Sequence, residues 1–382
     1  MGFLKRLYYP EPNLYSDEKG RVYFYDNLRF ILIVLVVLSH FIMRVEGLRG
    51  KIGGGDDFDE LSAFYEVFSW FMMPLFIFIT GFFSKSLYSK EGNFRRSRIV
   101  TFFALFIVMD TLVYFSNCLG AGKFVAYQPY IMYKSQWFLF SCGIWFLLIP
   151  LMRKVSAAVM IPVSIFVGVL GGFILGGVIL SVSKIFAFFP FFVIGYYMTR
   201  AHIERFLQVK ARCRILALAF FVALFAVTLV FLQESLLYAR PVEEAARSYW
   251  TMFYNVRPSH LFVPSVELQC LIRVGWYLAA FGTSALFMLI VPMKKTIWTK
   301  FGSRTLQIYI WHSVVVRLIR LTPFYGWVSG PSRGLSELIV LVAVIAVSFL
   351  LAFKPLGAPF AWVTKLVAKI PDKKPKTAAL GA

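Results

Sequence analysis

The sequence predicts an all-α, polytopic membrane protein of about ten transmembrane helices with both termini in the cytoplasm. Of its 382 residues, 59% are hydrophobic and only 15% are charged, which is more apolar surface than a soluble fold can bury. Apolar runs of eighteen or more residues recur along the chain, and about twenty such residues in a helix cross the hydrocarbon core of a bilayer. Lys and Arg are unevenly shared between alternate connections, as the positive-inside rule requires.

The apolar runs divide the chain into three regions. Residues 1–27 are predicted as a cytoplasmic segment, 28–353 as the transmembrane domain, and 354–382 as a basic cytoplasmic tail. Prolines fall inside some spans, which bilayer helices tolerate when neighbours satisfy the freed carbonyls. The predicted spans are 28–45, 61–84, 99–117, 135–151, 157–182, 185–199, 214–234, 269–292, 305–321 and 335–353.

The distribution of basic residues predicts the orientation of these spans. One set of alternate segments, which includes both termini, holds 26 of the 40 Lys and Arg residues, and the opposite set holds 13. This excess predicts that both termini are cytoplasmic. The expected location of the chain is the plasma membrane of a bacterium, which is its inner membrane. Anionic lipid headgroups account for the net charge of +21 without a nucleic-acid partner, so none is expected.

The first span carries two polar residues on one face. Arg29 and His40 are eleven residues apart, a step of about 1100°, which is about 20° past three helical turns. They therefore share a stripe and lie about 16 Å apart along the axis. Asp26 lies within about 40° of the same stripe. Charged groups inside a bilayer are costly and often mark functional sites.

An arginine near the cytoplasmic side and a histidine deeper along one face suit a long anionic donor such as acyl-coenzyme A. Arg29 would hold phosphate oxygens bidentately, and His40 would take a proton from an attacking hydroxyl. The alternative reading is structural. In that reading Arg29 extends to the lipid headgroups and His40 makes an interhelical hydrogen bond.

The remaining segments resemble the membrane acyltransferase 3 family when they are read together with the Arg29 and His40 spacing. The resemblance covers nearly the whole chain, and five matches in order make it specific. The further matches are the second-span segment 73–83, the basic stretch 95–98 opening the third span, Gln136 to Pro150 in the fourth, and Phe301 to His312 in the ninth.

The resemblance implies an O-acyltransferase that moves an acyl group, often acetyl, from cytoplasmic acyl-coenzyme A to a hydroxyl of a cell-surface carbohydrate, polysaccharide or glycolipid. The chain looks most like the fucose 4-O-acetylase-related branch. His40 is then expected to act as general base or as an acyl-carrying nucleophile. Many relatives that modify lipopolysaccharide carry a glutamate in the fourth span, where this chain has Cys142. No acidic partner is therefore assigned there.

Other polar and aromatic residues are candidates for the same chamber. Arg95 and Arg98 would bind donor phosphates together with Arg29, although ordinary positive-inside charge also explains them. Contacts between helices or an aromatic belt are the alternative for the rest. The candidates for lining a cavity are Asp26, Glu66, Asp110, Trp137, Tyr309 and His312.

A secondary transporter or glycan flippase is the competing function, because intramembrane Arg, His and Asp also build transport pathways. The two halves of the chain show no obvious repeat of one another, which many transporters have. A structural or sensory subunit is a third possibility. No metal-ligand spacing occurs, so no metal is expected. The outer segment 236–268 is a candidate region for a polar acceptor.

Overall fold

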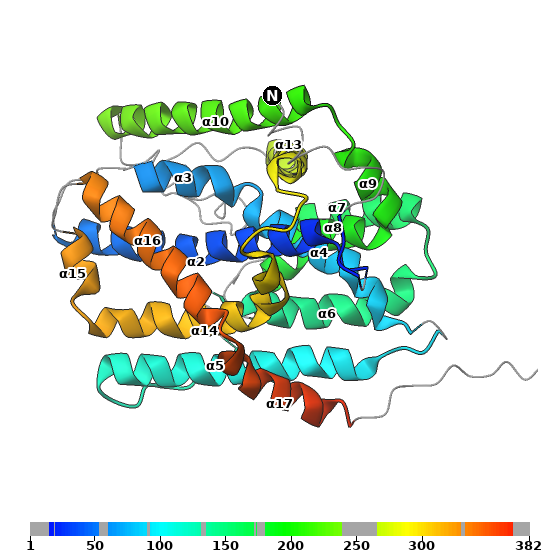
Figure 1. Cartoon of the computed structure of the whole chain (residues 1–382), viewed down its shortest axis with the longest axis horizontal. Coiled ribbons are helices and arrows are strands. Elements are labelled where there is room, and N and C mark those ends of the chain that lie inside the picture. Colours follow the sequence, from blue (N-terminus) through cyan, green and yellow to red (C-terminus); the bar gives the residue numbers. More distant parts are fainter. Residues whose placement is uncertain are drawn as a thin grey trace, which may run out of the picture.

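The computed structural model of the chain is built from helices, and no strand occurs among the residues that it describes. The structure describes residues 15–18, 20–52, 60–89, 92–130, 135–171, 173, 180–238, 266–329 and 333–369. Most of the outer segment 236–268 lies outside these residues. Figure 1 shows long helices lying side by side along a common direction, with α2 among them. The α-helices are α2 (Tyr23–Ile52), α3 (Glu60–Ser69), α4 (Met72–Ser84), α5 (Arg96–Ala121), α6 (Trp137–Met152), α7 (Ala157–Gly171), α8 (Val182–Tyr197), α9 (Arg200–Leu207), α10 (Ala211–Tyr238), α13 (Val266–Ile290), α14 (Thr305–Leu318), α15 (Phe324–Ser329), α16 (Arg333–Leu351) and α17 (Ala358–Val367).

The length and composition of the helices confirm several membrane spans. Among the described residues, five helical stretches are long and apolar enough to cross a bilayer, and the number rises to seven if each of two bent helix pairs counts as one span. Each of the ten spans expected from the sequence overlaps a described helix. The lower number has a physical reason, since α6, α7 and α14, of 16, 15 and 14 residues, are shorter than about 30 Å at 1.5 Å per residue.

The second expected span is broken in the middle. Helix α3 ends at Ser69 and α4 begins at Met72, so that Pro74 lies in the first turn of α4. Proline is tolerated there because the first-turn amides have no acceptor within the helix. The interruption therefore sits where Pro74, which has no amide hydrogen, cannot continue the hydrogen bonding of α3 into α4. The two helices still form one apolar stretch, Ala63–Leu87, that is long enough to cross a bilayer.

Helices α4 and α8 approach each other closely through two glycines. A Cβ at Gly81 would lie 2.1 Å from the carbonyl oxygen of Phe192, and a Cβ at Gly195 would lie 2.0 Å from that of Phe78. Both distances are far inside contact, so only glycine permits this crossing. Small residues at helix crossings are a common packing device in membranes, and here they hold in place the helix that carries one wall of the pocket described below.

The start of α2 is anchored to the segment before α14. The Asn27 side chain is fully buried, and its amide donates to the carbonyl oxygens of Pro292 and Lys294, each at 2.8 Å. Its oxygen accepts from the hydroxyls of Thr296 at 2.9 Å and Thr299 at 2.6 Å. The Asn27 side chain therefore donates two hydrogen bonds and accepts two. This anchor lies two residues before Arg29.

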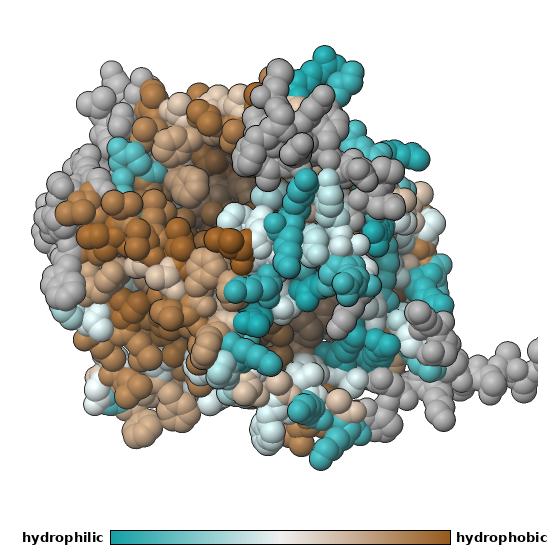
Figure 2. Space-filling view, in the orientation of Figure 1, coloured by the Kyte–Doolittle hydropathy of each residue, from teal (hydrophilic) through white to brown (hydrophobic). Residues whose placement is uncertain are grey.

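The region predicted as a C-terminal tail begins with ordered helix. A 3-10 turn, η4 (Lys354–Gly357), leads into α17, which bends by 67° from α16 and contacts α5. Trp311 Nε1 donates to Leu356 O at 2.9 Å and holds this turn against α14. Figure 2 shows apolar residues over α14 and α16, and hydrophilic residues gathered toward the end of the molecule near α9 and α17.

Candidate active site

Arg29 lies half-buried on α2 and lines a pocket of about 230 Å³. Its guanidinium carbon lies 3.9 Å from the centre of the Phe83 ring, which is a cation–π contact. Within the described part of the chain Arg29 forms no ion pair. A half-buried guanidinium that faces a cavity without a carboxylate partner is suited to bind an anion.

Polar groups gather at the end of this pocket near Arg29. Arg98, at the start of α5, also lines the pocket and donates through Nη1 to the Ser86 hydroxyl at 2.6 Å. Arg95 Nη1 donates to the Ser86 carbonyl oxygen at 3.4 Å. The sequence predicts that all three arginines bind the donor. In the structure Arg29 and Arg98 line the pocket, whereas Arg95 does not line it and contacts it only through Ser86.

The walls of the pocket are mostly apolar and come from five helices and one 3-10 turn. Helices α2, α4, α5, α6 and α14 contribute side chains, together with η1 (Lys85–Leu87). The lining residues besides the arginines are Leu32, Phe76, Ile79, Thr80, Phe83, Ser84, Ser86, Leu87, Phe102, Phe138, Phe146, Thr305, Leu306 and Tyr309.

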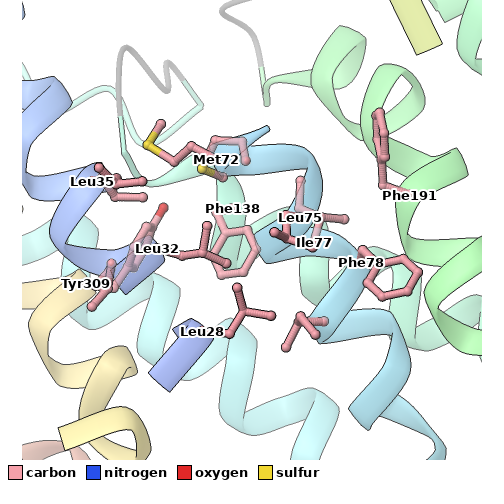
Figure 3. Close-up of a cluster of buried hydrophobic side chains, with 14 of the residues drawn as sticks. Leu28, Leu32, Leu35, Met72, Leu75, Ile77, Phe78, Phe138, Phe191 and Tyr309 are labelled. Atoms are coloured by element: carbon pink, nitrogen blue, oxygen red, sulfur yellow. The ribbon is translucent and has the colours of Figure 1, made fainter. Parts of the chain in front are cut away.

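Three aromatic rings close the end of the pocket away from the arginines. Phe138 meets Phe76 edge-on, with ring centroids 5.3 Å apart, and meets Tyr309 at 5.2 Å. Figure 3 shows Phe138, Tyr309 and Leu32 lying near one another, each from a different helix. We call Phe76, Phe138 and Tyr309 the ring partition.

His40 and His312 lie beyond the ring partition, stacked on each other. Their ring centroids are 5.1 Å apart and their planes differ by 28°. His312 follows Tyr309 by one helical turn on α14, with ring centroids 5.4 Å apart. It is 0% exposed, and neither ring nitrogen has a hydrogen-bond partner among the described residues. Burying an imidazole without hydrogen-bond partners is costly, and a substrate group could supply the missing partner.

Ser135 connects the ring partition to the histidine pair, and the sequence did not single it out. The Tyr309 hydroxyl donates to the Ser135 carbonyl oxygen. The Ser135 hydroxyl forms a hydrogen bond with the hydroxyl of Ser313, which follows His312. No local signal marks a serine of this kind, because its role depends on contact with a helix 178 residues further along the chain.

Asp26 stands outside the pocket lining. Its carboxylate accepts from Arg21 Nε at 2.5 Å and Nη2 at 2.7 Å, and it is 3% exposed. The hydrogen bond to Asp26 raises the pKa of the Arg21 guanidinium above its ordinary value. Asp26 lies on the same face of α2 as Arg29 and His40, but its carboxylate is paired with Arg21, which precedes the helix.

Three other expected cavity residues also lie apart from the pocket lining. Asp110 is buried on α5 and accepts from Gln136 Nε2 at 3.4 Å. Trp137 stacks on Phe188, with ring centroids 5.2 Å apart. Glu66 is half-buried on α3. Asp110 and Trp137 contact residues of other segments, whereas Arg29, Arg98 and Tyr309 line the cavity.

The pocket therefore has anion-binding arginines at one end, and the imidazoles of His40 and His312 lie beyond its other end. Among the described residues no three His, Cys, Asp or Glu side chains converge as metal ligands. Cys142, to which the sequence assigned no acidic partner, is fully buried in α6. The arrangement suits proton transfer and the binding of a charged substrate.

Comparison with known proteins identifies the chemistry. A family model described as an acyltransferase domain matches residues 22–353. No curated protein and no solved structure matches the chain. The matched region includes all the helices that line the pocket and the stacked histidines. The chain therefore belongs to the acyltransferase 3 family and is a membrane acyltransferase.

Proposed function

We propose that the protein is an O-acyltransferase that moves an acetyl group from cytoplasmic acetyl-coenzyme A to a hydroxyl of a cell-surface or periplasmic carbohydrate or glycolipid. In this proposal the chain spans the bacterial inner membrane ten times, with both termini in the cytoplasm, and belongs to the fucose 4-O-acetylase-related branch. The 26 to 13 division of Lys and Arg supports the orientation.

One observation carries the proposal. A pocket with Arg29 and Arg98 at one end leads to a ring partition, and two stacked histidines lie directly behind that partition. A donor with phosphates at one end and a thioester at the other matches this order of groups. The arginines would hold the phosphates, and the pantetheine arm would occupy the apolar length of the pocket.

The chemistry assigned to the histidines follows from proton balance. His40, as general base, takes the proton of the acceptor hydroxyl while the alcohol oxygen attacks the thioester carbonyl. The carbon–sulfur bond then breaks, and the coenzyme A thiolate leaves and takes up a proton. His312 is assigned as a positioning residue, since its ring lies against His40. In this proposal the Phe138 ring, which is held by packing alone, shifts far enough to admit the two-carbon acetyl group to His40.

The test uses purified full-length protein with radiolabelled acetyl-coenzyme A and a panel of glycan acceptors. We expect the wild type to transfer label, His40→Ala to transfer none, and Arg29→Ala chiefly to weaken donor affinity. Transfer by His40→Ala at the wild-type rate would remove His40 from the mechanism. Should the wild type bind no acyl-coenzyme A at all, transport of a glycan or lipid-linked substrate becomes the better account.

A further inference from the structure

We propose that the ring partition selects the length of the acyl group, so that the enzyme uses short acyl donors and rejects long ones. This inference rests on the proposed donor site. It assigns Phe138 as the main determinant of specificity, with Phe76 and Tyr309 as its supports.

The length of the pocket places the acyl group against the partition. Phe146 and Phe138 line the two ends of the wall that α6 contributes, and the step of eight residues from one to the other spans about 12 Å. A pantetheine arm extended from the arginines is longer than this, so its thioester reaches the far end. The acyl chain then points at the rings.

The rings leave no channel for a longer chain. Phe138 is 4% exposed and Tyr309 is 3% exposed. Their ring centroids are separated by only 5.2 Å, a distance typical of aromatic rings in direct contact. Leu32, which is fully buried on α2, fills the adjoining space. An acetyl group adds one methyl against this wall, whereas a hexanoyl chain would have to displace it.

The three rings are not equally fixed. The Tyr309 hydroxyl is hydrogen-bonded to the Ser135 carbonyl oxygen, which holds its ring in place. Phe138 has no polar atom to anchor its ring and is held by packing alone, against Phe76 and Tyr309 among others. Phe138 is therefore the side chain whose removal opens the partition with the least disturbance to the rest of the site.

A longer acyl chain should weaken donor binding in the closed pocket of the wild type and strengthen it in the opened pocket of a Phe138 variant. Burying a methylene ordinarily tightens binding about fourfold. In an opened pocket hexanoyl-coenzyme A should thus bind more tightly than acetyl-coenzyme A. In the wild type, overpacking against the rings should reverse that order.

The experiment measures dissociation constants of acetyl-, butyryl- and hexanoyl-coenzyme A by calorimetry with the purified full-length chain. We expect the wild type to bind acetyl-coenzyme A at least about tenfold more tightly than the hexanoyl donor. Phe138→Ala should bind the hexanoyl donor at least about tenfold more tightly than the wild type does. Phe138→Leu should shift the same ratio in the same direction, and it replaces the alanine variant if that one does not fold.

Phe140→Ala is the matched control. Phe140 lies on the same helix, but its ring packs on Phe103 and Phe106 of α5 and does not line the pocket. This variant should keep the wild-type preference. Equal binding of all three donors by the wild type, or an unchanged ratio in the Phe138 variants, overturns the inference and leaves the donor site standing. Absence of any acetyl-coenzyme A binding by the wild type overturns both.

Discussion

His40 on α2 and His312 on α14 are stacked ring on ring, with centroids 5.1 Å apart, although 271 residues separate them along the chain. The two helices thus join their imidazoles on the far side of the ring partition. His312 is fully buried and its nitrogens have no hydrogen-bond partner among the described residues. Its neutral ring therefore offers one donor and one acceptor that a substrate group could engage.

A first prediction concerns His312 itself. His312→Phe keeps a ring against His40 but removes both nitrogens. If the nitrogens support proton transfer, kcat should fall by about tenfold or more, while the KM for acetyl-coenzyme A stays unchanged because His312 does not line the pocket. Steady-state kinetics measure both values. A variant with wild-type kcat would show that only the ring is needed.

A second prediction separates two arginines at the start of α5. Both side chains, Arg96 and Arg98, are exposed, but only Arg98 lines the pocket. Losing a hydrogen bond to a charged group costs about 1.5–3 kcal/mol. Arg98→Ala should therefore weaken acetyl-coenzyme A binding by about tenfold to hundredfold in a titration, and Arg96→Ala should leave it nearly unchanged. Equal losses in both variants would point to general surface charge.

A third prediction tests the glycine crossing of α4 and α8. Gly195→Ala forces a methyl group against the Phe78 carbonyl oxygen, and the rigid backbone cannot rotate away. We expect a loss of about 1–3 kcal/mol in the free energy of unfolding, seen as a lower melting temperature in detergent. Gly275→Ala is the control, since nothing lies within 4 Å of its added Cβ. A melting temperature unchanged by Gly195→Ala would contradict the close crossing.

A fourth prediction concerns the anchor at Asn27. Asn27→Ala removes the donor to two carbonyl oxygens and the acceptor of two hydroxyls. It should cost at least about 2 kcal/mol of stability, although the Thr296 and Thr299 hydroxyls still bond each other. The exposed Asn117, which accepts one bond from Arg317 Nε at 3.2 Å, offers a control in Asn117→Ala. Thermal unfolding compares the two. Similar small shifts would mean that the anchor adds little to the fold.

The sequence by itself determined the features that depend on local order. Apolar runs predicted helices, because a backbone in lipid must satisfy its own hydrogen bonds, and a helix overlaps each predicted span. The spacing of Arg29 and His40 placed both on one face, since helical rotation is the same wherever the helix lies. The family resemblance is likewise a property of the chain, and the match over residues 22–353 confirmed it.

Only the tertiary structure decided which of these groups meet. Asp26 shares the stripe of Arg29, yet it pairs with Arg21, and the rings of Phe138 and Tyr309 stand between the pocket and His40. Such contacts join helices that are distant in sequence. They depend on how side chains from several helices fill one shared volume, and helical periodicity within a single span carries no information about that volume.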